Sequence, residues 1–198
     1  MYPEYAEVNG KKYKINTDFR VAIECNNITQ KDDIGNYERA LAIIYKLYGQ
    51  EGLNDFDNHT KLLEIGRRFL LCDKEYEETS NNLEPDMDYS EDMDYIEASF
   101  MSDYNIDLST QTMHWWKFQK LINGLSNSEL GNCCILNRIR GIRNYDTKDI
   151  KDPKQLAQIN ELKRQFALKK KQPKIELTDK QKKSRDEFYK LMGWEGSE

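Results

Sequence analysis

The stretch MHWWKFQKLINGL, from Met113 to Leu125, places two tryptophans next to each other at the start of a pattern with helical spacing. Successive side chains of an α-helix are about 100° apart, so Trp115 and Trp116 cannot both point to the centre of one face. The face that contains Trp115 is broadly apolar, and we predict that it belongs to the core. Its members are Trp115, Phe118, Leu121, Ile122 and Leu125.

Trp116 falls on the other, mixed face of this predicted helix, together with Met113 and Lys120. Either a second element of the same chain covers this face, such as the acidic segment or the C-terminal helices, or a partner protein binds to it. Tryptophan and methionine are favoured at the anchor positions of protein interfaces. The candidate partner-binding residues are therefore Met113, Trp116, Lys120 and, near the C-terminus, Trp194.

The rest of the chain predicts a mainly α-helical fold with one short N-terminal β-hairpin. Asn9-Gly10 lies between two short alternating runs, which predicts a hairpin over about residues 4–15 because a type I′ turn needs two positive φ angles. Helical spacing recurs along the chain, and Tyr45 belongs to the apolar stripe of the second predicted helix. The first predicted helix is capped by one of Asn16, Thr17 and Asp18. The other predicted helix boundaries are Gly49, Asn58, Asp73, Ser90, Ser109 or Thr110, Gly124, Ser126 with Glu129, Pro153, Leu168 and Thr178.

Length and composition indicate a soluble helical protein. The chain has 198 residues, of which 38% are hydrophobic and 33% are charged, and this length fits one domain with an appendage. We predict that the domain covers residues 1–150. The appendage is then a basic, partly extended helical region over residues 151–198. Apolar runs stay well below the roughly 18 residues that a membrane helix requires. The N-terminal sequence does not resemble a secretory signal, and the four scattered cysteines are typical of reduced thiols in a cytoplasm.

Charge is distributed unevenly along the chain. Residues 73–107 contain thirteen acidic residues and one basic residue, whereas residues 151–190 contain thirteen basic and six acidic ones. Such a pattern suits a nucleic-acid-binding arm, a partner-binding tail or an intramolecular match between the two blocks. The acidic stretch over about 76–92 contains Pro85 and no clear period, so we predict a mobile, solvated loop there.

No motif predicts catalysis, a cofactor site or a metal site. The chain has two histidines, His59 and His114, and adjacent Cys133 and Cys134 do not have the spacing of zinc ligands. The acidic loop lacks the central glycine of a calcium-binding EF-hand loop, and no phosphate-binding glycine loop occurs. The basic C-terminal region has few interleaved aromatics, so a solvated helix pair is favoured there over a nucleic-acid-binding surface.

Several of these features together resemble a known family. The order is a Trp-Trp-x-Phe element, then an Ile-Arg-Gly turn, then a Leu-Lys-x-x-Phe-Ala-Leu helix. It resembles the family named after gene product fifteen in phages of Gram-positive bacteria, most closely over residues 90–170. The matching residues are Trp115, Trp116, Phe118, Leu121, Leu125, Ile139, Arg140, Gly141, Leu162, Lys163, Phe166, Ala167 and Leu168.

This resemblance implies a small phage or prophage protein that acts in tail assembly. Such proteins are encoded between the major tail protein and the tape measure protein of long-tailed phages. They are regarded as non-enzymatic chaperones in the host cytoplasm that are absent from the finished virion. The expected partner is the tape measure protein or another tail protein, and a homo-oligomer is left open. The alternatives are a nucleic-acid-binding protein that uses its basic C-terminal helices, and a structural tail component.

Overall fold

The structure is a computed structural model that describes residues 2–31, 34–74, 85–127 and 133–169. It is mainly α-helical with an N-terminal hairpin, as the sequence predicts. In chain order the elements are β1 (Tyr5–Val8), β2 (Lys11–Lys14), α1 (Phe19–Thr29), α2 (Asn36–Leu53), the 3-10 helix η1 (Phe56–Asn58), α3 (His59–Leu70), α4 (Met93–Tyr104), α5 (Trp115–Asn123), α6 (Ile135–Asn144) and α7 (Pro153–Phe166).

The chain divides into two compact units, Met1–Phe166 and Ala167–Glu198. The first unit contains all of these helices and strands, and the boundary predicted near residue 150 lies before α7. Trp194 and the helix predicted to follow Thr178 lie outside the described residues. No helix in the described part of the chain is long and apolar enough to span a bilayer.

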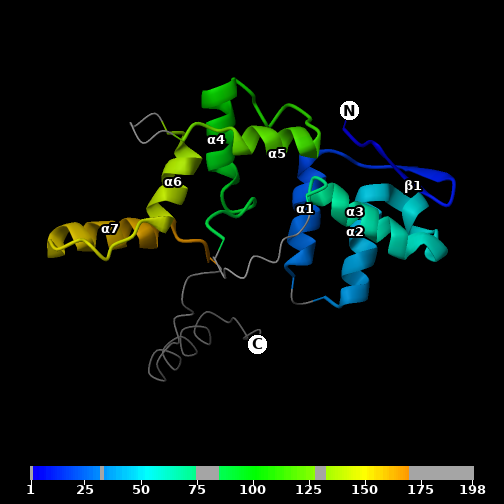
Figure 1. Cartoon of the computed structure of the whole chain (residues 1–198), viewed down its shortest axis with the longest axis horizontal. Helices are drawn as coiled ribbons and strands as arrows, with labels where there is room; N and C mark the ends of the chain where they lie inside the picture. The colour runs from blue at the N-terminus through cyan, green and yellow to red at the C-terminus, as the bar shows by residue number, and fades with distance from the viewer. Residues whose placement is uncertain (1, 32–33, 75–84, 128–132, 170–198) are drawn as a thin grey trace, which may run out of the picture. The chain divides into compact units, whose positions relative to one another are not determined.

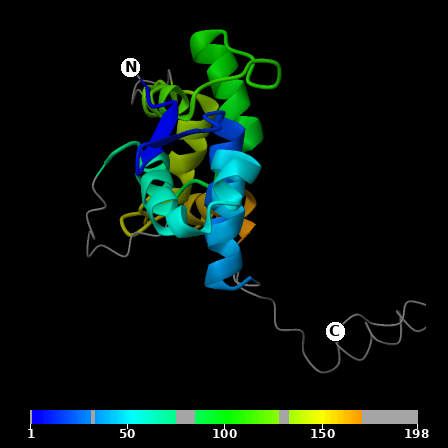
Figure 2. The same cartoon turned by 90° about the vertical axis from the view of Figure 1, so that its right-hand side faces the viewer.

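The hairpin packs on α2 and α3, and Figures 1 and 2 show it beside these helices. Its turn residues Asn9 and Gly10 have φ angles of 52° and 81°, as a type I′ turn requires. One face of the hairpin, with Ala6, Val8 and Tyr13, is buried. The predicted stop at Gly49 is a kink with φ 66°, after which α2 continues to Leu53.

An aromatic stack joins α1, α4 and α5 in the core. The ring of Phe118 lies between those of Phe19 and Phe100, with centroids 4.7 and 5.3 Å away and nearly parallel planes. All three side chains are at most 2% exposed. Burying rings of this size supplies much of the hydrophobic stabilisation of a domain. Phe118 therefore holds α5 against both α1 and α4.

The acidic segment differs from the predicted solvated loop. Residues 75–84 lie outside the described part, but Asp92 is fully buried and its two carboxylate oxygens each accept a hydrogen bond from Arg143 of α6. Asp86 makes a single, more exposed contact, in which one carboxylate oxygen accepts from the Arg140 Nε at 3.2 Å. A buried carboxylate needs an opposite charge and hydrogen bonds, and α6 provides them. The intramolecular match therefore involves α6, which lies between the two charge blocks.

Three helices begin later than predicted, and the first of them, α4, begins at Met93 rather than at Ser90. The tryptophan helix begins after His114 rather than after Ser109 or Thr110, because His114 is extended and forms a β-bridge with Asp18, the residue before α1. The next helix begins after Cys134, whose sulfur accepts a hydrogen bond from the Asn137 backbone N–H. Of the predicted capping box, Glu129 lies outside the described residues.

Candidate functional site

The N-termini of α1 and α5 are joined to each other by backbone hydrogen bonds. The Phe19 N–H donates to the Met113 carbonyl at 2.9 Å, and the Trp115 N–H donates to the Thr17 carbonyl at 2.7 Å. Asp18 and His114 form the resulting antiparallel bridge, and each also caps its own helix with a side-chain acceptor. This arrangement satisfies backbone groups at both helix starts, so it fixes the direction of the tryptophan helix.

The His114 ring is held in one tautomer. Its Nδ1 accepts from the Trp116 N–H at 3.0 Å, so the ring proton is on Nε2, which lies 3.0 Å from the Pro3 carbonyl. Tyr2 stacks on this ring with centroids 4.8 Å apart. The imidazole is therefore a structural cap that holds the N-terminal residues against α5.

The adjacent tryptophans bind two successive carbonyls at the end of α3. The Trp115 Nε1 donates to Leu70 at 2.9 Å, and the Trp116 Nε1 donates to Phe69 at 2.8 Å. Trp115 is 2% exposed, whereas Trp116 is half-buried. The last carbonyls of a helix have no partner within it, so the two indoles provide a C-terminal cap for α3.

The mixed face of α5 is covered by its own chain. Trp116 packs against Phe69 and Tyr2, with ring centroids 6.5 and 6.4 Å away. The Lys120 Nζ lies 5.0 Å from the centre of the Tyr2 ring, within the range of a cation–π contact. Among the described residues, the elements that cover this face are thus the N-terminal residues and α3.

The predicted site residues have different surroundings. Met113 is 6% exposed and lies before the helix, which corrects its placement as an anchor on an outer face. Lys120 is exposed, and Trp194 lies outside the described residues. Among the predicted core residues, Leu121 is half-buried and four are buried: Trp115, Phe118, Ile122 and Leu125.

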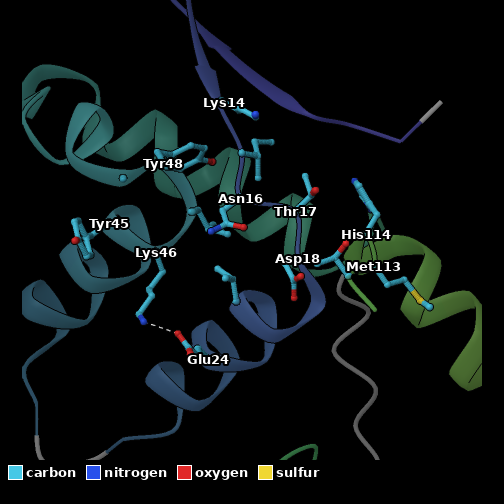
Figure 3. A pocket seen from close by; sticks show the side chains of 15 residues that line it. Lys14, Asn16, Thr17, Asp18, Glu24, Tyr45, Lys46, Tyr48, Met113 and His114 are labelled. Atoms are coloured by element: carbon cyan, nitrogen blue, oxygen red, sulfur yellow. Dashed lines mark ion pairs between the residues drawn. The ribbon is translucent and has the colours of Figure 1, made fainter. Parts of the chain in front are cut away.

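An open groove of about 860 Å³ lies beside this junction (Figure 3). Its walls are the segment that follows β2, the helix α1 and residues 45–49 of α2. Asn16 and Thr17 lie along its floor, and the Asn16 N–H donates to the Leu47 carbonyl at 2.7 Å. Among the described residues, neither the Asn16 carboxamide nor the Thr17 hydroxyl has a hydrogen-bond partner. Both side chains are therefore available to a ligand of the groove.

The α2 wall of the groove carries an aromatic ring and an ion pair. Tyr45, predicted as part of a buried stripe, is 50% exposed and lines the groove. The Lys46 Nζ lies 2.5 Å from the Glu24 carboxylate across the groove, and this bond raises the pKa of Lys46 (Figure 3). No sequence pattern indicated this groove, because its walls come from three segments that are distant in the chain.

The described residues do not assemble a recognisable catalytic centre. Within them, no group of three or more His, Cys, Asp or Glu side chains is placed to hold a metal ion. All four cysteines are free, and burial raises the pKa of the Cys25 thiol to about 12, which keeps it protonated and unreactive.

Comparison with known proteins identifies one family. The chain matches the family described as "Bacteriophage Gp15 protein" over residues 2–168, which include every element of the described fold. Neither the curated proteins nor the solved structures contain a match.

Proposed function

The chain belongs to the bacteriophage Gp15 protein family, and we propose that it is a non-enzymatic tail-assembly chaperone that binds the tape measure protein. In this proposal it acts in the host cytoplasm and leaves before the virion is complete. A tape measure protein is a very long and largely helical chain. Its apolar stripes must be kept from aggregating until tail subunits polymerise around it.

The groove beside the α1–α5 junction carries this proposal. It combines an exposed aromatic ring, Tyr45, with unpaired polar groups on Asn16 and Thr17. Partner-binding surfaces typically combine aromatic anchors with a polar rim. Trp116 and Met113 pack against their own chain, so Tyr45 replaces them as the candidate anchor.

The rigidity of the groove supports the same proposal. Backbone hydrogen bonds join its floor to α2 through Asn16 and to α5 through Thr17. A preorganised surface loses less conformational entropy on binding. An amphipathic segment could then place an apolar side chain against Tyr45 and its polar flank against Asn16.

Co-expression with a fragment of the cognate tape measure protein tests this function. We expect the chain to raise the soluble fraction of the fragment, and Tyr45→Glu to abolish that effect. Tyr37→Glu is the matched control, because Tyr37 lies on the same helix, is 65% exposed and does not line the groove. Equal solubility with and without the chain would contradict the chaperone function, and equal effects of both variants would contradict the groove.

The protein composition of the virion distinguishes a chaperone from a structural tail component. Purified virions should lack the chain if it is a chaperone, as measured by mass spectrometry of the tails. A stoichiometric amount in washed particles would instead show a tail component.

A further inference from the structure

We propose that the groove beside Tyr45 binds the backbone of an extended stretch of the partner, with an acidic side chain of that stretch opposite Lys14. This inference rests on the proposed function and specifies the form in which the partner is recognised. Among the described residues, three features of the groove support it: its polar exposed lining, the unpaired carboxamide of Asn16 and the unpaired charge of Lys14.

The exposed lining of the groove is too polar to hold the apolar stripe of a helix. Four of the five exposed residues that the structure describes along it are polar or charged: Lys14, Asn16, Glu24 and Thr112. The fifth is Tyr45, which provides one aromatic anchor. A helix that docks into a groove places apolar anchors from successive turns against a hydrophobic surface. This lining therefore favours a partner that is bound mainly through polar groups.

The Asn16 carboxamide matches the hydrogen-bonding groups of a peptide. Its NH2 group donates and its carbonyl oxygen accepts, so this one side chain can bind both a C=O and an N–H of another chain. The side chain is exposed in the groove and has no hydrogen-bond partner among the described residues. Its backbone is fixed, because the Asn16 N–H donates to the Leu47 carbonyl at 2.7 Å. The carboxamide is therefore positioned to bind a partner.

The backbone groups of a partner are free in an extended stretch and not in the interior of a helix. Inside a helix each N–H bonds to the carbonyl four residues earlier. The N–H and C=O groups of an unpaired extended stretch need partners outside it, and Asn16 and the Thr17 hydroxyl can supply them. Extended peptides gain affinity from such main-chain hydrogen bonds, and side-chain contacts add specificity. The polar groups of the groove therefore suit an extended stretch.

The charges of the groove select an acidic side chain on that stretch. Its two acidic residues are already paired within the chain. Asp18 lies 3.2 Å from Arg20, and Glu24 lies 2.5 Å from Lys46 (Figure 3). Lys14 is exposed, lines the groove and has no ion-pair partner in the part of the chain that the structure describes. A carboxylate of the partner opposite Lys14 would complete the pairing of charges.

This mode of binding distinguishes an unfolded stretch of the partner from a folded one. When the stretch becomes part of a helix, its N–H and C=O groups bond within that helix. The Asn16 carboxamide then loses both of its partners, and the contact weakens. Helix formation during assembly would thus release the chaperone.

Fluorescence anisotropy with the full chain and labelled peptides tests the proposal. The tightest binder among overlapping short peptides of the cognate tape measure protein is compared with the same sequence stapled as a helix. Two staples at different positions ensure that one of them can point away from the groove. We expect both stapled peptides to bind about tenfold or more weakly than the flexible peptide. Equal or tighter binding of a stapled peptide would overturn the proposal, and so would a lack of binding by any peptide.

A double-mutant cycle tests the backbone contact at Asn16. N-methylation removes one N–H donor of the peptide at a time, and Asn16→Leu removes the carboxamide at a similar size. Each change should weaken binding about fivefold or more, and at one peptide position both together should cost no more than either alone. Asn123→Leu is the matched control, because Asn123 is exposed and does not line the groove. Additive effects at every position would contradict the contact.

Charge reversal tests the acidic side chain of the partner. Lys14→Glu should weaken binding about tenfold at low salt and less at high salt, because salt screens the pair. Lys12→Glu is the matched control, since Lys12 is exposed on the same strand and does not line the groove. Equal effects of both variants would contradict a carboxylate opposite Lys14, and circular dichroism verifies that each variant is folded.

The result for the chaperone function can be separated from this one. If a stapled peptide binds best while co-expression still raises the soluble fraction of the tape measure fragment, the extended form is wrong and the function stands. If flexible peptides bind as expected but solubility does not change, the function is wrong and the binding mode stands.

Discussion

Arg143 and Asp92 form an ion pair inside the protein, 51 positions apart in the chain. Two guanidinium nitrogens each lie 2.7 Å from a carboxylate oxygen, and the two side chains are 9% and 1% exposed. Arg143 also donates to the carbonyls of Asp86 and Phe166. One side chain thus joins the acidic segment, α6 and the end of α7.

Replacing Arg143 with methionine should be strongly destabilising. It leaves the Asp92 carboxylate buried without its partner, and breaking such a pair costs about 3–5 kcal/mol. Urea unfolding followed by circular dichroism measures the free energy of unfolding. The matched control is Arg164→Met, because Arg164 pairs with Glu161 on the surface, and an exposed pair contributes little to stability.

The double variant Asp92→Leu with Arg143→Met gives a further check on the pair. Removing both charges avoids an unpaired buried carboxylate, so the double variant should be more stable than Arg143→Met alone. Equal stability of Arg143→Met and the wild-type protein would show that the pair does not hold the acidic segment in solution.

Trp116→Ala should lower the free energy of unfolding by about 3 kcal/mol, near the low end for a large aromatic residue because the ring is half-buried. The change also leaves the Phe69 carbonyl without its indole donor. Trp115→Ala should cost more, since Trp115 is 2% exposed. Thermal unfolding measures both, and Phe56→Ala on the surface should be close to neutral. If the Trp116→Ala variant is as stable as the wild type, the contact between Trp116 and Phe69 does not contribute to stability.

The sequence pattern predicts the inward face of the tryptophan helix well, because helical period alone places Trp115, Phe118 and Ile122 together. It misplaces Met113, since helical angles apply only within a helix and α5 begins after His114. That start depends on the pairing of His114 with Asp18, a long-range contact that local spacing does not contain.

The candidate groove could not be predicted either, because it too depends on contacts between residues that are distant in the chain. Tyr45 has the spacing of a buried position, yet its ring is 50% exposed and lines the groove. The acidic and basic stretches of the sequence indicate where charges of each sign are concentrated, but they do not indicate which residues form ion pairs. Arg143 pairs with Asp92 from a position outside both blocks, because tertiary packing rather than charge density places α6 there.

Tyr13→Phe should raise the pKa of Asp55 toward its ordinary value. The Tyr13 hydroxyl donates to Asp55 and is the main cause that lowers the pKa of this carboxyl from 3.8, with Asn58 and Lys11 contributing. Carboxyl carbon chemical shifts followed by NMR across acidic pH measure the pKa. Asp107, whose pKa is lowered mainly by Ser109, should not change and serves as a control in the same spectra.

The stability of the same variant should depend on pH in a defined direction. A carboxyl with a lowered pKa in the folded chain stabilises folding above its unfolded pKa, and this contribution is lost as the pH falls through the folded pKa. Tyr13→Phe should therefore be less stable than the wild type at neutral pH, with a difference that narrows below the unfolded value of 3.8. A difference that widens in acid would contradict this linkage.

Cys25 should resist thiol reagents in the folded protein. It is fully buried, and burial raises its pKa to about 12, so little thiolate forms at mildly alkaline pH. Cys133 and Cys72 are half-buried and should react first. Timed labelling with a maleimide, followed by peptide mass spectrometry, measures the rate at each site, and Cys133→Ser removes the fastest signal as a control. Labelling of Cys25 as fast as that of Cys133 would mean that α1 opens locally, without global unfolding.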